Sequence, residues 1–194
     1  MSGPGAGLRL ATLADAAQVQ GIYAPIVRDT FISFEVDVPG VAEMERRIRA
    51  ALDRHAWLAF EDSDGIAGYA YATKHRERRA YQWSVDVSCY VHARARRRGI
   101  ASRLYEALFR VLVLQGFTNA FAGIALPNAA SVGMHESVGF TTVGVYANAG
   151  FKCGEWHDVL WMQRVLAGAG TDPQEPLPLA ALSPRALHAA FIGP

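Results

Sequence analysis

Hydrophobic and polar positions change their period in the middle of the chain. From Trp83 to Val91, apolar residues alternate with serine, aspartate and tyrosine, as in a strand that has one apolar and one polar face. After a polar interval, apolar residues recur at helical spacing from Ile100 to Leu112, and Gly116 is suited to end that helix. The pattern therefore predicts a strand, a short loop and a helix, in that order.

The loop between this strand and this helix is basic and contains a glycine. It holds Arg94, Arg96, Arg97, Arg98 and Gly99. The first turn of a helix has N–H groups without internal partners, its dipole favours negative charge, and glycine lets an anion approach the main chain. The spacing fits neither the Walker lysine motif nor the G-x-G-x-x-G dinucleotide fingerprint. The loop is thus a candidate anion site, with a solvated basic loop as the alternative.

The other hydrophobic patterns predict an α/β domain. Helices are indicated after a capping-box-like pair of Thr12 and Asp15, at 41–52 and at 129–138. Strands are indicated at 8–12, 56–60, 66–72, 119–126, 140–146 and 156–164, with loops at 29–37, 74–79 and 148–155. This order favours a mixed, mostly antiparallel central sheet flanked by helices.

The end of the chain has a different composition. Residues 1–166 contain the predicted elements, whereas 167–194 are rich in alanine, proline and leucine without sustained periodicity. We expect one domain followed by a tail that packs on its surface or on a partner.

Composition and charge narrow the classes of function. The 194 residues are 51% hydrophobic, and the formal net charge is +1, so no global field favours nucleic acid. The start of the chain does not resemble a signal peptide, and no stretch approaches the roughly 18 apolar residues of a membrane span. We expect a cytoplasmic protein without a membrane or nucleic-acid partner. Two cysteines, Cys89 and Cys153, are too few for a disulfide framework or a zinc site, so no metal is expected.

Several motifs resemble those of one superfamily. The spacing Arg96-x-x-Gly99-x-Ala101 is similar to the pyrophosphate loop of the GNAT (Gcn5-related N-acetyltransferase) enzymes. Segments 67–72, 78–86, 126–140 and 150–159 resemble its phosphinothricin and methionine sulfone or sulfoximine N-acetyltransferases. The resemblance implies the GNAT fold, acetyl-CoA as the acetyl donor, and the α-amino group of a small amino acid derivative as the acceptor. A polyamine, an antibiotic or a protein N-terminus as acceptor, and a non-catalytic acetyl-CoA-binding protein, are the alternatives.

The resemblance also assigns two catalytic residues. It places the general base at Asp86, on the polar face of the central strand, where related enzymes carry a glutamate. The shorter aspartate requires a closer amine or an intervening water. His135 matches the position from which the CoA thiolate is protonated. From the residues alone, the alternatives for Asp86 are an exposed strand face or a salt bridge to one of the nearby arginines, and the alternative for His135 is a structural hydrogen bond.

The remaining site residues fall into a donor group and an acceptor group. The resemblance assigns acetyl-CoA contacts to the strand end, the loop and the first helical turn, namely Cys89, Tyr90, Val91, Arg96, Arg97, Arg98, Gly99, Ile100, Ala101 and Ser102. It adds Asn128 and Ser131, although an N-cap also explains Asn128. Positive charge and aromatic walls for the small-molecule amine are expected from Phe34, Arg76, Arg78, Tyr81 and Lys152. We further expect a homodimer.

Overall fold

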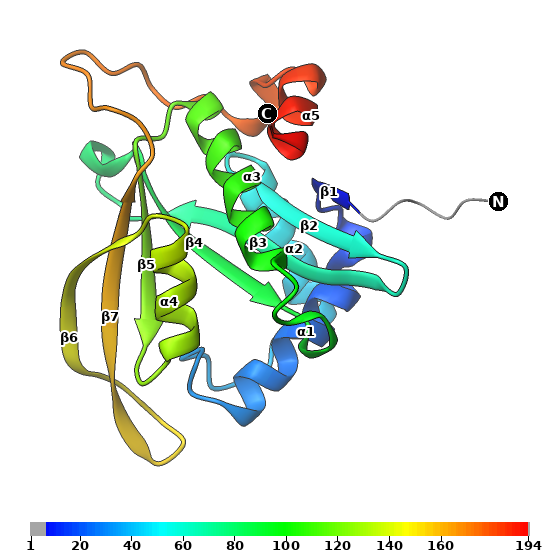
Figure 1. The fold of residues 1–194 in the computed structure, drawn as a ribbon, viewed down its shortest axis with the longest axis vertical. Helices are drawn as coiled ribbons and strands as arrows, with labels where there is room; N and C mark the ends of the chain where they lie inside the picture. Colours follow the sequence, from blue (N-terminus) through cyan, green and yellow to red (C-terminus); the bar gives the residue numbers. More distant parts are fainter. Residues whose placement is uncertain (1–6, 194) are drawn as a thin grey trace.

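The central feature of the computed structural model, which describes residues 7–193, is a seven-stranded sheet in the order β1-β2-β3-β4-β5-β7-β6 (Figure 1). All neighbouring strands are antiparallel except β4 and β5. The mixed, mostly antiparallel sheet predicted from the sequence is therefore confirmed. The strands are β1 (Gly7–Leu10), β2 (Trp57–Asp62), β3 (Gly65–Lys74), β4 (Ser84–Val91), β5 (Asn119–Ala125), β6 (Thr141–Lys152) and β7 (Glu155–Val165).

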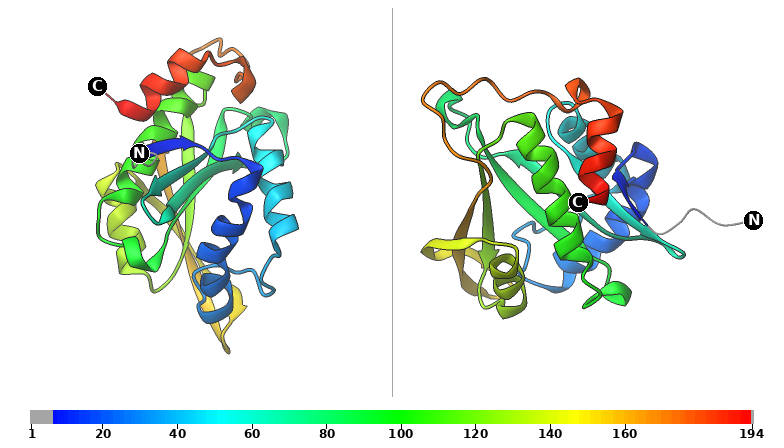
Figure 2. Two further views of the ribbon diagram at one scale, coloured as in Figure 1. Left: turned by 90° about the vertical axis from the view of Figure 1, so that its right-hand side faces the viewer. Right: turned by 45° about the horizontal axis from the view of Figure 1, so that its top comes forward.

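Helices cover both faces of the sheet, and each face has its own apolar core (Figure 2). On one face, α1 (Ala16–Asp29) and α2 (Val41–Leu52) pack on an aromatic layer that includes Trp57 and Tyr69. On the other face, α3 (Ile100–Gln115) buries Leu104, Leu108 and Leu112, and α4 (Ala129–Ser137) lies beside it. No helix among residues 7–193 is long and apolar enough to cross a membrane.

The segment with the change of period forms β4, a 3₁₀ turn at Ala93–Ala95 and α3. Gly99 is the N-cap of α3 and Gly116 its C-cap, with φ angles of 72° and 94°. These left-handed conformations cost glycine little, and so the two glycines set the limits of the helix.

The parallel strands β4 and β5 pair only at their first residues and then diverge (Figure 1). Their register runs from Ser84 opposite Asn119 to Asp86 opposite Phe121. Beyond this point, β4 continues to pair with β3 as far as Val91, and β5 pairs with β7. The sheet is therefore open between β4 and β5, and Asp86 lies where the opening begins.

The hairpin of β6 and β7 is longer than its sequence suggests. The glycine-rich segment 148–155, predicted as a loop, instead continues β6 to Lys152, and only Cys153 and Gly154 form the turn, both at positive φ. Gly150 pairs with His157, and Phe151 pairs with Trp156. A register irregularity between Tyr146 and Gly150 interrupts the pairing without ending it.

The C-terminal segment packs on α3 and ends in a helix that was not predicted, α5 (Pro184–Ile192) (Figure 2). Ser183 caps its N-terminus by accepting a hydrogen bond from the N–H of Ala186. Leu179 and Ala190 are buried in the α3 core. The tail is thus part of the same core as α3.

Candidate active site

The opening between β4 and β5 forms a cleft, here called the β4–β5 cleft. It is lined by residues 87–90 of β4, residues 122–125 of β5, Ile32, Tyr105, Asn128, Ser131 and His135. Because β4 and β5 do not pair here, main-chain groups on their facing edges are available to a ligand. An extended molecule with amide groups can therefore lie along the cleft as an additional strand does.

A second hollow extends this cleft toward the arginine loop. Ile32 lines both hollows, and the second is also lined by Val91, His92 and Arg96. The two hollows therefore meet at Ile32, and the second reaches the arginine loop at Arg96.

The loop at the N-terminus of α3 has the geometry of an anion site. Arg97 and Gly99 both adopt left-handed conformations, with φ of 59° and 72°. Within residues 7–193, no side chain caps the first turn of α3, and nothing lies within 4 Å of the position a Cβ of Gly99 would take. Exposed N–H groups and a concave main chain are suited to a phosphate group.

Two of the arginines hold the loop in place. Arg94 and Arg98 lie 2.8 Å and 3.3 Å from Oδ2 of Asp62, at the β2–β3 turn. The Arg94 hydrogen bond is the main reason that the pKa of Asp62 falls to about 2. The positive charge of Arg98 is therefore shared between Asp62 and any bound anion.

Asp86 is hydrogen-bonded to a side chain that the sequence did not suggest as its partner. Its Oδ1 lies 2.6 Å from Nδ1 of His75, at the end of β3. Burial raises the pKa of Asp86, whereas the hydrogen bond from His75 lowers it, and burial is the larger effect. Asp86 therefore has a side-chain partner, but this partner is a histidine instead of an arginine, and the contact is an ion pair only when His75 is protonated.

His135 is buried in the wall of the cleft and uses both ring nitrogens. Nδ1 lies 2.8 Å from the carbonyl oxygen of Ser131, and Nε2 lies 3.0 Å from the hydroxyl of Tyr105. A carbonyl oxygen only accepts, so Nδ1 carries the hydrogen and Nε2 accepts from Tyr105. Burial lowers the pKa of His135, which favours the neutral ring. The structural hydrogen bond considered for His135 is present, and Tyr105 joins it to the cleft.

Two further donor-side residues have local structural roles. Asn128 is the N-cap of α4, because its Oδ1 accepts a hydrogen bond from the N–H of Ser131. This is the role predicted from the sequence as the alternative to a contact with acetyl-CoA. Burial raises the pKa of the Cys89 thiol to about 12. Cys89 is therefore a neutral thiol at neutral pH, and a nucleophilic cysteine would need the thiolate form.

Three of the expected acceptor residues lie on the β3–β4 connection. Tyr81 is exposed, and its ring contacts His75 edge-on with centroids 5.9 Å apart. The guanidinium of Arg76 lies 5.5 Å from the ring centroid of Trp161. Arg78 lines a separate hollow, whose basic residues also include Arg54, Lys74 and Arg79. Arg76 and Tyr81 are therefore grouped around the His75–Asp86 pair, whereas Arg78 faces the neighbouring hollow.

Lys152 has a different role from the one expected. Its ammonium donates to the carbonyl oxygens of Val27 and Ser33, both at 2.7 Å. These bonds tie the β6–β7 hairpin to the α1–α2 loop, as does the stacking of Phe31 on His157 with centroids 4.1 Å apart. The ammonium group of Lys152 is hydrogen-bonded to main-chain carbonyl oxygens. The side chain therefore holds the α1–α2 loop in place and is not directed toward a ligand.

Phe34, from the same loop, is packed against the hairpin. A Cβ added to Gly150 would lie 2.4 Å from the Phe34 ring, so this position requires glycine as long as the ring stays in place. The ring is 37% exposed. Phe34 is therefore available to a ligand, and Gly150 allows it to sit where it does.

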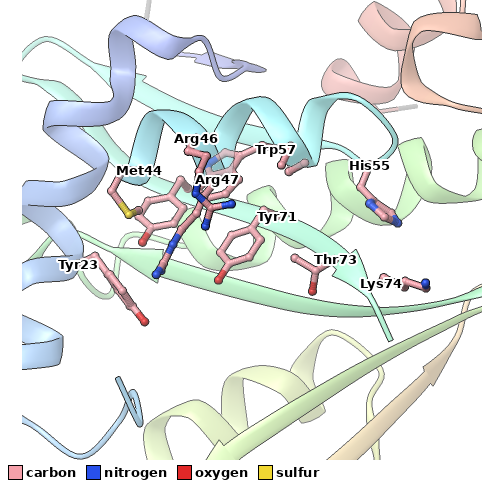
Figure 3. A pocket seen from close by; sticks show the side chains of 12 residues that line it. Tyr23, Met44, Arg46, Arg47, His55, Trp57, Tyr71, Thr73 and Lys74 are labelled. Atoms are coloured by element: carbon pink, nitrogen blue, oxygen red, sulfur yellow. The ribbon is translucent and has the colours of Figure 1, made fainter. Parts of the chain in front are cut away.

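A separate cavity of about 410 Å³, here called the α2 cavity, lies on the sheet face that carries Asp86 (Figure 3). Tyr71, Thr73 and Lys74 follow one another along β3 at its base, and α2 lies across it (Figure 3). Thr73 is the cross-strand partner of Asp86. The cavity therefore ends beside the His75–Asp86 pair, on the side where an acceptor can approach it.

Sequence reasoning did not identify His75 or Tyr105 as site residues. His75 lies in the segment predicted as the loop at 74–79, and Tyr105 belongs to the helical pattern of α3. Their partners lie 11 and 30 residues away along the chain, so only the fold brings them together.

Comparison with known proteins agrees with this geometry. The model of the acetyltransferase (GNAT) domain matches residues 8–161. Phosphinothricin N-acetyltransferase of Streptomyces viridochromogenes is 38% identical over 157 residues, which are 81% of this chain and 86% of that protein. L-methionine sulfoximine/L-methionine sulfone acetyltransferase of Pseudomonas paraeruginosa is 30% identical over 160 residues, which are 81% of this chain and 93% of that protein.

A solved structure extends the similarity to three dimensions. The phosphinothricin acetyltransferase of Sinorhizobium meliloti, crystallised in complex with acetyl-CoA, has a TM-score of 0.84 and 33% identity to this chain, with 90% of this chain and 96% of that one covered. The family match spans most of the chain and includes β4, the arginine loop and α4. This chain therefore belongs to the GNAT acetyltransferase family.

Proposed function

We propose that the protein transfers the acetyl group of acetyl-CoA to the α-amino group of a small amino acid derivative of the phosphinothricin, methionine sulfone or methionine sulfoximine type. The observation that carries this proposal is the β4–β5 cleft, with the carboxylate of Asp86 at one end and the arginine loop at the other. The names and acceptors of the relatives support the choice of acceptor.

The residues of the cleft fit acetyl-CoA. The pyrophosphate would bind the first turn of α3, through the N–H groups near Gly99 to Ser102 with Arg96, Arg97 and Arg98 around them. The pantetheine arm would lie along Cys89, Tyr90 and Val91 opposite β5, near Asn128 and Ser131. This arrangement would bring the thioester to the start of the β4–β5 divergence.

The proposed reaction begins with the acceptor amine. Asp86 takes one proton from the ammonium group, which frees the nitrogen lone pair. The nitrogen then bonds to the carbonyl carbon while the carbon–sulfur bond breaks. The hydroxyl of Tyr105, which is hydrogen-bonded to Nε2 of His135, donates its proton to the departing thiolate, and the second amine proton passes to the Tyr105 oxygen in its place. The products are the amide and free CoA, and the proton on Asp86 is released to solvent.

The acceptor side combines positive charge with aromatic surfaces. Arg76 would contact the carboxylate or phosphinate of the acceptor, Arg78 would add positive charge from the neighbouring hollow, and Phe34 and Tyr81 would flank the acceptor side chain. The α2 cavity, which ends at Thr73, offers space for a side chain longer than those of these acceptors.

The experiment is an acceptor panel. Purified protein with acetyl-CoA and methionine sulfone or phosphinothricin should release free CoA in proportion to the acetylated product. Polyamines, aminoglycosides and peptides with a free N-terminus test the other acceptors. Release with one of these and with no amino acid derivative would contradict the proposed acceptor. Binding of CoA without turnover of any amine would favour a non-catalytic binding protein.

The assembly and location of the protein are further proposals. A homodimer in the cytoplasm fits a soluble acceptor and an intracellular donor. Sedimentation analysis of the purified protein measures the first, and fractionation of producing cells measures the second.

A further inference from the structure

The side chain of His75 is held between aromatic rings. It stacks on Phe121, with ring centroids 4.3 Å apart and planes 15° from parallel. Trp161 and Tyr81 contact its ring edge-on, at 6.3 Å and 5.9 Å between centroids. Only 10% of the His75 side chain is exposed. These contacts come from three elements, so the orientation of the ring is fixed by tertiary packing.

This fixed ring donates one hydrogen bond, and the acceptor is Asp86. The Nδ1 to Oδ1 distance is 2.6 Å, which is short and typical of a bond to a charged acceptor. Oδ2 of Asp86 accepts no hydrogen bond from residues 7–193, and 29% of the Asp86 side chain is exposed. The carboxylate therefore has one oxygen held by His75 and one available on the open side.

Without the His75 ring, neither the charge nor the orientation of the Asp86 carboxylate would be fixed. Burial disfavours its charged form, and a single carboxylate at the edge of an opening in a sheet has several rotamers. The Nδ1–H group of His75, whose direction is fixed, stabilises the negative charge of Asp86 and selects one of its rotamers. The titratable or charged neighbours of the pair are Arg76, which donates to the carbonyl oxygen of His75, and Tyr81, whose ring contacts His75 edge-on; Phe121 and Trp161 carry no charge.

We propose that His75 is a positioning residue that fixes the carboxylate of Asp86 through Nδ1–H, so that Oδ2 takes the proton of the acceptor amine. This inference rests on the proposed function. In the transfer, the hydrogen on Nδ1 stays on His75, and the only proton that moves to the pair goes from the amine nitrogen to Oδ2 of Asp86. Exposure favours this assignment, since the carboxylate is reachable and the ring is almost enclosed.

The first test needs no substrate. The carboxyl carbon of Asp86 is followed by ¹³C NMR across pH in the wild-type protein, in His75→Phe and in His75→Asn. Phenylalanine keeps the stacking on Phe121 without a donor, and the asparagine amide places a donor close to the position of Nδ1. We expect Asp86 to titrate at higher pH in His75→Phe and near its wild-type pH in His75→Asn. An unchanged titration in His75→Phe would overturn the proposal.

The second test is kinetic and uses the acceptor identified by the panel. His75→Phe should lower kcat about 10²-fold, as expected for a displaced catalytic group, and leave the KM for acetyl-CoA unchanged. The acid limb of kcat/KM should move to higher pH, and His75→Asn should restore most of the rate. A His75→Asn variant as slow as His75→Phe would show that the ring itself takes the proton, and would overturn the proposal.

The two tests fail in different ways. If the wild-type protein acetylates no amine, the proposed function fails, but the NMR titration still shows whether His75 controls Asp86. If turnover is normal and the titration of Asp86 does not depend on His75, only the positioning role fails. In an Asp86→Asn background, adding His75→Phe should cause no further loss of rate, because the two residues act as one unit.

Discussion

Burial sets the charge of the polar side chains around the β4–β5 cleft. It raises the pKa of Tyr105 far above its ordinary range and lowers that of His135, so the pair is neutral and shares one hydrogen. It also raises the pKa of Asp86, which only His75 and the nearby Arg76 oppose. At the scale of single residues, the protonation of the site is thus set by burial and by the few neighbouring groups that oppose it.

Replacing the proposed base is the most direct residue-scale prediction. We expect Asp86→Asn to lower kcat by about 10²- to 10⁴-fold, because an amide cannot accept the proton. Since the wild-type enzyme requires the carboxylate, its kcat/KM should rise with pH through the raised pKa of Asp86, and this limb should be absent from the variant. Steady-state kinetics from pH 5 to 9 measures both. Exposed Asp37→Asn is the control and should behave as wild type.

A second residue-scale prediction concerns the α2 cavity. Thr73 lies between the cavity and Asp86, so Thr73→Trp should block that side and raise the KM for the acceptor about tenfold. The KM for acetyl-CoA should not change. Thr141→Trp, at an exposed position of β6, is the matched control. An unchanged acceptor KM in Thr73→Trp would show that the acceptor does not approach along this cavity.

At the scale of elements, the N-terminus of α1 is fixed by an ion pair. Asp15 lies 2.7 Å from Nη1 of Arg9, and its carboxylate also accepts the N–H of Thr12. Burial raises the pKa of Asp15, but the bonds from Arg9 and Thr12 outweigh it, and the net pKa is lowered. The pair joins β1 to the start of the helical layer that covers the α2 cavity.

This ion pair predicts how stability depends on pH. Because the pKa of Asp15 is lower in the folded protein, its contribution is complete above the unfolded value of about 3.9 and is lost as the pH falls through the folded value. Asp15→Asn should lower the free energy of unfolding at pH 7 by about 2 kcal/mol, less than for a fully buried pair because Arg9 is partly exposed. Urea unfolding at pH 7 and pH 3 measures this. In the control, Asp29→Asn, no change is expected, since its pair with Arg28 is exposed.

The contact between the hairpin and the α1–α2 loop gives another element-scale prediction. Gly150→Ala would place a methyl group 2.4 Å from the Phe34 ring, and the ring must move. We expect about tenfold weaker acceptor binding with unchanged acetyl-CoA binding, because a small displacement of a positioning group is costly. Gly144→Ala lies on the same strand with nothing within 4 Å and is the control. Equal KM values for the acceptor in the two variants would show that Phe34 is not part of the acceptor site.

Sequence patterns predicted the helices and strands that are determined by residues close together in the chain. The alternation in β4 and the periodicity of α3 are properties of neighbouring residues, and both elements were predicted nearly to their ends. The extension of β6 was missed because Gly150 indicates a loop, whereas here glycine gives space to Phe34. The signal for α5 was present, since Ser183 and Pro184 are typical of an N-cap and first helical position, but its apolar face is short and rich in alanine.

For the candidate site, the limit is different. The arginine loop is contiguous, so spacing identified it, and the positions of Asp86 and His135 came from family resemblance. The partners that control these two side chains, His75 and Tyr105, are brought to them by strand pairing and helix packing. No local pattern contains that information.

At the scale of the whole molecule, the C-terminal segment stabilises the α3 face. Gln115 donates to the carbonyl oxygens of Arg54 and Leu177, which joins the end of α3 to the α2–β2 connection and to the tail. Trp83 Nε1 donates to the carbonyl oxygen of Gln174, beside an ion pair of Arg79 with Glu175. The tail thus links α3 to Trp83, the residue before β4.

A pair of leucines in this segment tests its contribution. Leu179 is 5% exposed in the α3 core, whereas Leu177 is 47% exposed. We expect Leu179→Ala to lower the free energy of unfolding by about 2–3 kcal/mol through lost burial and a cavity, and Leu177→Ala to have little effect. Urea unfolding followed by circular dichroism measures both. Equal effects of the two substitutions would show that the tail lies outside the cooperative core.

The packing of α5 also decides how this protein can be shortened. The family match ends at residue 161, inside β7, whereas buried side chains continue to Ala190. A recombinant fragment cut at that residue would divide the hairpin and expose the apolar surface of α3 that Leu179 and Ala190 cover. The segment that the family model matches is therefore smaller than the unit that folds, and a shortened recombinant protein should keep the chain to the end of α5.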